Sequence, residues 1–103
     1  ANITGGGLSD NIKRIIPDEL SANINLDQIK TSRIFNWLKS NGISDKEMLQ
    51  TFNCGVGFCL IIERKNLKKI NKFFSKKYKP YVIGKIFKGK NKIKLNGSIN
   101  WLS

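Results

Sequence analysis

The stretch Ala22-Asn23-Ile24-Asn25-Leu26 alternates apolar and polar side chains along its whole length. Successive side chains of a strand point to opposite faces, so this alternation predicts a strand with one buried face. An apolar strand face needs a second layer to cover it, and the segments on both sides of this stretch have helical patterns. The stretch therefore predicts a sheet with helices packed on it.

The segment before this strand is a predicted helix over residues 7–16. Leu8, Ile12 and Ile15 recur at i, i+4 and i+7, so they fall on one helical face. Pro17 ends the helix, because proline disfavours helical geometry at the residue before it. We therefore expect a short helix with one apolar face.

Two more helices are predicted after the strand, over residues 32–41 and 44–51. Ser44 and Glu47 at the start of the second one fit a capping box, in which each side chain satisfies a backbone N–H of the first turn. The predicted core-facing side chains are Ile34, Phe35 and Leu38 in the first helix and Met48, Leu49 and Phe52 in the second.

The C-terminal half adds strands and one helix. Residues 56–62 form a continuous apolar run, which predicts a central strand buried on both faces. Residues 66–77 have a helical apolar stripe with lysines largely away from it. Further strands are predicted over residues 81–87 and 92–95, with a short edge strand over 98–102. This order predicts an α/β or α+β fold, a mixed sheet with helices packed on it. The stripe of the 66–77 helix consists of Leu67, Ile70, Phe73 and Phe74.

Size and composition indicate a single domain. The chain has 103 residues, 40% of them hydrophobic, which fits one modest core. No apolar run approaches the roughly 20 residues of a membrane helix and no signal-peptide pattern is present, so we expect a cytoplasmic protein with no membrane partner. Cys54 and Cys59 are expected to be reduced thiols, and two cysteines without any histidine make no zinc site. The chain starts with Ala1, and a glycine-rich loop follows at residues 4–7 with no room before it for the strand that should support such a loop. We therefore expect residues 1–103 to be a piece of a longer protein.

The formal net charge of +12 lies entirely in the C-terminal part. Residues 1–63 hold six basic and seven acidic side chains, whereas residues 64–103 hold 13 basic and none acidic. Such a concentration of positive charge fits either a nucleic-acid-binding surface or a lysine-rich face that is simply solvated. The scarcity of Arg, the biased use of Lys, Asn and Ile, and the predicted place of Phe73 and Phe74 on an apolar stripe favour the solvated face. A small basic nucleic-acid-binding module is the alternative function.

A glycine-rich loop, Thr4-Gly5-Gly6-Gly7, leads into the first predicted helix. A helix N-terminus presents unpaired N–H groups, and glycine lets the backbone approach a phosphate closely. Neither the Walker A nor the dinucleotide-binding spacing is met. Two interpretations stay open, an anion-binding loop and a tight turn in which the glycines adopt positive φ or pack closely.

A second motif, Thr51-Phe52-Asn53-Cys54-Gly55-Val56-Gly57, joins the capped helix to the predicted central strand. Asn and two glycines at such a junction allow an unusual turn and a close backbone approach, although a plain helix–strand connection is the other interpretation. Cys54 is expected to be a packing residue, because no histidine is present to activate it as a nucleophile.

Together these motifs resemble one enzyme family, the phosphoribosylformylglycinamidine cyclo-ligases, also called aminoimidazole ribonucleotide (AIR) synthetases. The resemblance spans about residues 1–87. The matching segments are Thr4-Gly5-Gly6-Gly7-Leu8, Asn11-Ile12, Arg14, Pro17, residues 34–38, Glu47-Met48, residues 51–57 and Ile83-Gly84. Related superfamily members, the formylglycinamidine synthases and selenophosphate synthetases, are less similar over residues 51–57.

The resemblance implies a C-terminal α/β domain, of which residues 1–103 are the distal part. It implies an ATP-dependent ring closure that converts formylglycinamidine ribonucleotide into aminoimidazole ribonucleotide, with Mg²⁺ accompanying the ATP. The family is homodimeric, and its N-terminal domain, absent from this chain, is expected to supply most nucleotide and dimer contacts. The fragment alone is therefore expected to be inactive. Its partners are the rest of its own chain, a second subunit and a nucleotide substrate.

The resemblance also implies site residues, although it assigns none a catalytic role and none to a metal. Asn2 stands where the family commonly has a histidine, and asparagine can donate and accept hydrogen bonds but cannot shuttle a proton near neutral pH. Either that histidine is a binding group that Asn2 replaces, or activity is altered. The basic tail after Ile86 is a second departure from the family. The expected substrate or phosphate-binding residues are Thr4, Gly5, Gly6, Gly7, Asn11, Asn53, Gly55 and Gly57.

Overall fold

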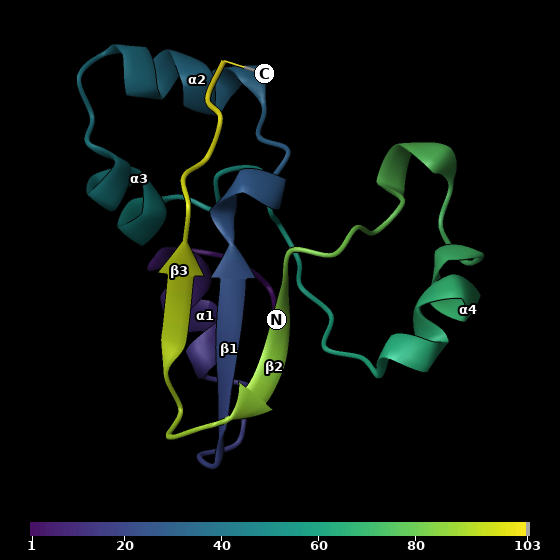
Figure 1. Cartoon of the computed structure of the whole chain (residues 1–103). Coiled ribbons are helices and arrows are strands. Elements are labelled where there is room, and N and C mark those ends of the chain that lie inside the picture. Colours follow the sequence, from purple (N-terminus) through teal and green to yellow (C-terminus); the bar gives the residue numbers. More distant parts are fainter. Residues whose placement is uncertain (103) are drawn as a thin grey trace.

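The computed structural model describes residues 1–102 and contains a three-stranded mixed sheet with helices around it, as predicted (Figure 1). The strands are β1 (Leu20–Asn25), β2 (Gly84–Lys88) and β3 (Ile93–Asn96). Their order in the sheet is β2-β1-β3, with β2 antiparallel and β3 parallel to β1. The chain is thus an α+β domain, and the alternating stretch that predicted the fold is its central strand.

Strands β2 and β3 lie on opposite sides of β1, so the link between them crosses the chain at the start of β1 (Figure 1). Ser21 fixes this crossing: its hydroxyl oxygen accepts a hydrogen bond from the Lys92 backbone N–H at 3.0 Å. Gly84 begins β2 opposite Ile24, where any Cβ would overlap the backbone carbonyl of Asn23. A glycine is therefore required for β2 to approach β1 this closely.

Three helices surround the sheet: α1 (Gly7–Lys13), α2 (Arg33–Ser40) and α3 (Asp45–Thr51). Helix α1 lies behind β1 and β3 and packs against α3 (Figure 1). The Ser44 half of the predicted capping box is confirmed, since the Glu47 N–H donates to the Ser44 Oγ at 3.2 Å. The buried apolar core consists of Ile3, Leu8, Ile12, Ile16, Ala22, Ile24, Leu26, Ile29, Met48, Cys54, Val56, Ile99 and Trp101.

Two helix predictions need correction. The first helix ends at Lys13 rather than Ile16. Ile15, the last residue of the predicted apolar face, lies beyond the helix and is 48% exposed. The bond from the Ile15 N–H to the Ile12 carbonyl, at 3.1 Å, tightens the chain ahead of Pro17. In α2, Ile34 is 57% exposed, so only two of its three predicted core residues, Phe35 and Leu38, pack against the core.

The predicted central strand over residues 56–62 is wrong. Within residues 1–102 this run is extended, but its only ladder contact is an isolated bridge between Asn2 and Phe58. The physical reason is that β2 and β3 already occupy both edges of β1, so the run cannot pair with it. The side chains of Phe58, Leu60, Ile61 and Ile62 are exposed as a result.

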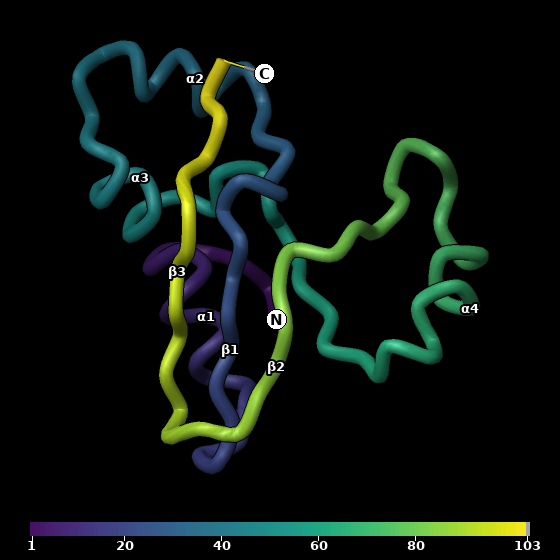
Figure 2. The backbone as a smooth tube through the Cα atoms, in the orientation of Figure 1, coloured from purple at the N-terminus to yellow at the C-terminus, as the bar shows by residue number. Residues whose placement is uncertain are grey.

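The predicted helix over residues 66–77 is also largely wrong. Only α4 (Leu67–Asn71) is α-helical, between the 3₁₀ turns η2 (Arg64–Asn66) and η3 (Lys76–Tyr78). Phe73, predicted on the buried stripe, is 78% exposed. A helix of this composition depends on packing of its apolar face, and here that face meets no sheet. Residues 64–82, called the basic lobe below, stand apart from the rest of the domain (Figures 1 and 2).

The C-terminal strand predictions are partly confirmed. The strand predicted over residues 92–95 is β3, and the one predicted over 81–87 starts three residues late as β2. Residues 98–102 form no strand. Trp101 is instead buried, and its indole N–H donates to the Asp45 carboxylate at 3.1 Å. No helix in the described part of the chain is long and apolar enough to span a membrane.

Candidate functional site

The glycine-rich loop makes a tight turn into α1. Gly6 and Gly7 have φ values of +97° and +74°, a region that residues with a Cβ rarely adopt. A Cβ on Gly7 would overlap the backbone carbonyl oxygen of Leu49, so this glycine lets α1 pack directly on α3. Gly5 differs, because it is exposed and nothing lies within 4 Å of the position of its Cβ. Gly6 and Gly7 thus fit the interpretation of a tight turn with close packing. Gly5 is the position of the loop at which the backbone is open to solvent.

Asn11 holds this loop together. It is 5% exposed, and its side-chain N–H₂ donates to the carbonyl oxygens of Gly7 at 2.7 Å and Thr4 at 3.2 Å. The Thr4 hydroxyl donates back to the Asn11 side-chain oxygen at 3.3 Å. Asn11 is therefore a positioning residue, since its polar atoms are used to fix the backbone of residues 4–7.

Arg14 is a site residue that sequence reasoning did not select. Its guanidinium donates to the Asn11 side-chain oxygen at 3.4 Å, which places a permanent positive charge beside the loop. The signal was available, because Arg14 belongs to the motif that carries the family resemblance. The loop also has an acidic neighbour, because a Cβ on Gly6 would lie 2.9 Å from a carboxylate oxygen of Asp10.

The second motif forms a turn in which both central residues have positive φ. Cys54 has φ +56° and Gly55 has φ +99°. The Asn53 side-chain oxygen accepts from the Gly55 N–H at 2.9 Å, and the Asn53 carbonyl accepts from the Val56 N–H at 3.0 Å. The predicted unusual turn is confirmed, and Asn53 stabilises it through its own side chain.

Cys54 lies inside this turn as a packing residue. Its side chain is fully buried and its thiol donates to the Met48 carbonyl oxygen at 3.4 Å. Burial, with a smaller contribution from the negative charge of Asp45, raises the pKa of the Cys54 thiol to about 11. A thiol that stays protonated at neutral pH is a poor nucleophile.

The structure brings the two motifs together. Residues 1–3 run antiparallel to residues 57–59, with the Ile3 N–H donating to the Gly57 carbonyl at 2.9 Å and the Cys59 N–H to the Ala1 carbonyl at 2.8 Å. Asn2 lies between these bonds, bridged to Phe58. The loop at residues 4–7 and the turn at residues 53–57 are thus neighbours, although almost 50 residues separate them in the sequence.

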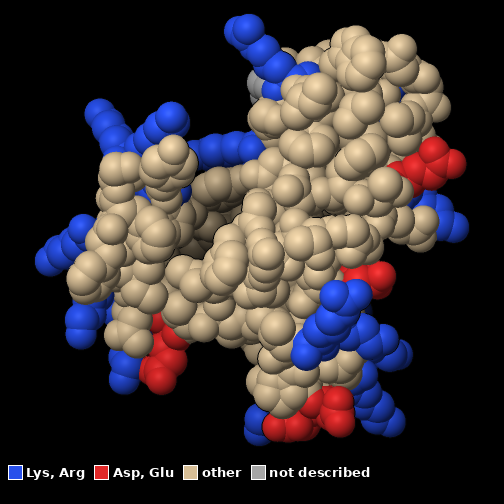
Figure 3. Space-filling view, turned by 180° about the vertical axis from the view of Figure 1, so that it is seen from behind, with Lys and Arg blue, Asp and Glu red and all other residues tan. Residues whose placement is uncertain are grey.

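A groove of about 830 Å³ opens beside this junction, between the body of the domain and the basic lobe. Figure 3 shows it as a dark hollow, with the lysine-fringed lobe to its left. Of the predicted site residues, only Gly55 and Gly57 line it. Its walls are mainly apolar, and the charged residues among its described lining are all basic: Arg64, Lys77, Lys79 and Lys85.

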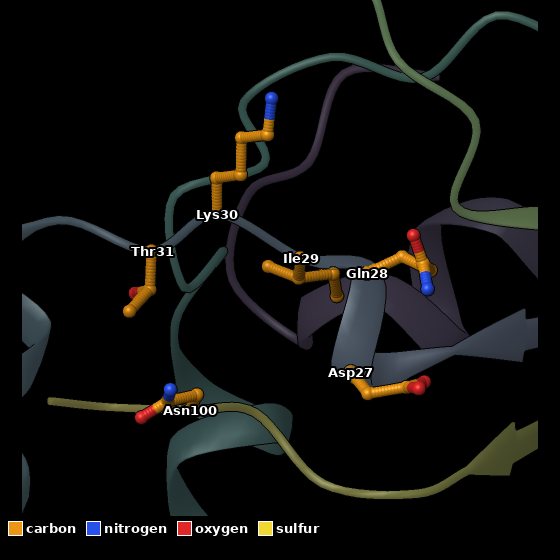
Figure 4. Close-up of a pocket in the computed structure, with 6 residues that line it drawn as sticks. All are labelled: Asp27, Gln28, Ile29, Lys30, Thr31 and Asn100. Atoms are coloured by element: carbon orange, nitrogen blue, oxygen red, sulfur yellow. The ribbon is translucent and has the colours of Figure 1, made fainter. Parts of the chain in front are cut away.

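A smaller hollow of about 460 Å³ lies between the segment that begins with η1 (Leu26–Gln28) and the C-terminal segment (Figure 4). Asp27, Lys30 and Asn100 are among its lining residues, but none of the predicted site residues is. In Figure 4 the side chains of Asp27 and Lys30 point in different directions, so they do not converge on one ligand. We therefore place the candidate site at the two motifs.

The residues present fit a phosphate better than a metal. An open glycine position, a rigid backbone turn and a guanidinium are the groups that recognise a phosphate. In contrast, residues 1–102 contain no group of three or more His, Cys, Asp or Glu side chains that could hold a metal ion. The Mg²⁺ implied by the family resemblance thus has no ligand set in the described part of this chain.

The fold and the two motifs define an α+β domain in which a glycine-rich loop at residues 4–7 lies beside the turn at residues 53–57. Residues 1–96 match the family described as AIR synthase related protein, C-terminal domain. Because the match spans nearly the whole chain, the chain belongs to this family.

Proposed function

We propose that this chain is the C-terminal part of an ATP-dependent cyclo-ligase that forms aminoimidazole ribonucleotide from formylglycinamidine ribonucleotide. The observation that carries the proposal is the convergence of the two family motifs, residues 4–7 and 53–57, in a chain whose family membership is shown. The expected cytoplasmic location follows from this role in purine synthesis.

In this proposal the glycine-rich loop binds the phosphate of the ribonucleotide. Gly5 is the point of approach, because it is exposed and has open space around it. Asn11 keeps the loop in one conformation, so little ordering is needed when the ligand binds. Arg14 supplies charge complementarity next to the loop.

In this proposal the second motif supports the loop from beside it, and its Gly55 and Gly57 line the neighbouring groove, which none of residues 4–7 lines. Asn2 occupies the position at which the family commonly has a histidine. Its amide can donate and accept hydrogen bonds, so we assign it a binding role and no proton transfer.

ATP and Mg²⁺ are assigned to the N-terminal domain of the complete enzyme. When bound, ATP supplies the phosphoryl group that activates the formyl oxygen. This chain contributes substrate binding and orientation, and a homodimer of complete subunits is the expected assembly.

The proposal is tested with a chimera, in which residues 1–96 replace the corresponding part of an active cyclo-ligase. The chimera is expected to restore purine-independent growth to cells that lack this enzyme. Arg14→Gln should raise the KM for the ribonucleotide by about 10- to 100-fold, because a hydrogen bond to a charged group is worth about 1.5–3 kcal/mol. Arg33→Gln is the matched control, an exposed arginine on α2. A folded chimera without ring-closing activity would contradict the proposal.

A further inference from the structure

The basic lobe has a second feature besides its charge: exposed aromatic side chains. Phe73 is 78% exposed, Tyr78 67%, Phe74 42% and Tyr81 36%. The sequence pattern predicted Phe73 and Phe74 on a buried stripe, which argued against a nucleic-acid surface. The structure contradicts that pattern, so the argument from buried aromatics no longer holds.

The charge of the lobe has one sign. Residues 64–82 contain no acidic residue, whereas residues 1–63 are nearly neutral. A codon bias that raised the lysine content evenly along the chain would not produce this difference. The Lys77 ammonium lies 5.4 Å from the centre of the Tyr78 ring. The Lys30 ammonium from the body of the domain lies 4.9 Å from the Tyr81 ring. The cations of the lobe are Arg64, Lys65, Lys68, Lys69, Lys72, Lys76, Lys77 and Lys79.

We propose that the basic lobe binds single-stranded nucleic acid. Cations beside exposed rings are the combination that holds such a strand, the lysines pairing with phosphates and the rings stacking on bases. The charged side chains among the described lining of the groove are all basic, which complements a polyanion. The nearest acidic residue in the sequence, Glu63, precedes the lobe and pairs with Lys65 at 3.2 Å. This inference is independent of the proposed ring closure.

Two observations favour a single strand over a duplex, with little sequence preference. Helix α4 has only five residues, so it offers no extended recognition helix for a major groove. Arg64 is the one arginine of the lobe, and bidentate reading of guanine depends mostly on arginine. Lysine and stacked rings recognise charge and base planes, which every sequence presents.

The test is fluorescence anisotropy of the full 103-residue chain with a labelled oligothymidine of about 16 nucleotides, the upper end of single-domain site sizes. Binding should weaken with salt, with a log–log slope of roughly −2 to −3.5 for three to five neutralised phosphates. A duplex of the same length should bind more weakly.

Paired variants separate stacking from charge. Phe73→Ala combined with Tyr78→Ala should lower affinity about tenfold or more, whereas Trp37→Ala, at a 61% exposed aromatic outside the lobe, should leave it unchanged. Lys68→Gln with Lys72→Gln should flatten the salt slope, and Lys13→Gln with Lys46→Gln should not. All four lobe positions are exposed, so these variants keep the fold.

Three results would overturn the inference. One is absence of binding at low salt. Another is equal binding of an abasic strand, which has phosphates but no bases and would reduce the lobe to a polyanion binder. The third is tighter binding of anionic phospholipid vesicles than of the oligonucleotide, which would assign the surface to a membrane.

Discussion

The body of the domain and the basic lobe use the same kind of sequence pattern with opposite results. In the body, α3 has a satisfied N-cap and buries Met48 completely. In the lobe, the segment predicted as a 66–77 helix has an equally clear apolar stripe, yet α4 ends at Asn71 and Phe73, two residues beyond it, is exposed. The difference shows that an apolar stripe becomes a buried helix face only where the topology supplies a surface to cover it. Each prediction below tests one side of this comparison.

The largest effect is expected at Gly7. Gly7→Ala should destabilise the domain by about 4 kcal/mol, because the new Cβ overlaps the Leu49 carbonyl oxygen and residue 7 has positive φ. Chemical denaturation measures the change. Gly5→Ala is the matched control and should cost less than about 0.5 kcal/mol, since nothing lies within 4 Å of its Cβ position. Equal effects of the two variants would contradict the packing described for the loop.

The next effect compares one large side chain from each region. Met48→Ala should cost about 3 kcal/mol, because Met48 is 0% exposed and its removal leaves a cavity. Phe73→Ala should change stability by less than about 0.5 kcal/mol, since Phe73 is mostly in solvent. Thermal or urea unfolding compares them. A loss at Phe73 as large as that at Met48 would mean that the lobe packs in solution.

A smaller effect is expected at Asn11. Asn11→Ala should cost about 1–3 kcal/mol, because it leaves the carbonyl oxygen of Gly7 without its 2.7 Å donor. Asn41→Ala on α2 is the control. Its side chain also donates to a carbonyl oxygen, that of Trp37 at 2.8 Å, but in an exposed position where water can replace it. Unfolding free energies should therefore rank Asn11→Ala well above Asn41→Ala, and the reverse order would remove Asn11 from its positioning role.

The smallest effect is a pH dependence at Cys54. Burial raises the pKa of this thiol from 9.0 to about 11, so the folded state resists its ionisation while the unfolded state does not. The stability that this thiol contributes is complete below pH 9 and is lost as pH rises towards 11. Urea unfolding of the wild type and of Cys54→Ala across this range isolates the contribution, because other groups titrate equally in both. Parallel curves for the two proteins would show that Cys54 is not protected by burial.

The sequence predicted those parts of the fold in which local and tertiary preferences agree. The alternation over residues 22–26 located β1, although β1 runs from Leu20 to Asn25 and Leu26 lies in the 3₁₀ turn η1. The Ser44 cap located the start of α3. Both signals depend only on residues that are close in the sequence. The apolar run at residues 56–62 and the stripe at residues 66–77 failed. Whether such segments pair or pack depends on which edges of β1 remain free, and that is a property of the whole topology.

The sequence motifs selected the residues of the candidate site, and the structure shows the packing and hydrogen bonds of several of them. Glycines and asparagines at Gly7, Asn11 and Asn53 were selected from motifs. The structure adds that these three serve packing and turn geometry, whereas Gly5 is open to solvent. Arg14 was not selected as a site residue, although it lies three residues after Asn11 at the end of α1, a spacing at which helical side chains meet.

The most direct measurement is an NMR titration of the ¹⁵N-labelled chain with ribose 5-phosphate, followed at the backbone amides. If the glycine-rich loop is a phosphate site, the largest saturable shifts should occur at Gly5, Gly6 and the neighbouring Gly57, and Arg14→Gln should reduce them. Shifts confined to residues 64–82 would contradict this account, because phosphate would then bind through the lysines of the lobe and the loop would be a structural turn alone.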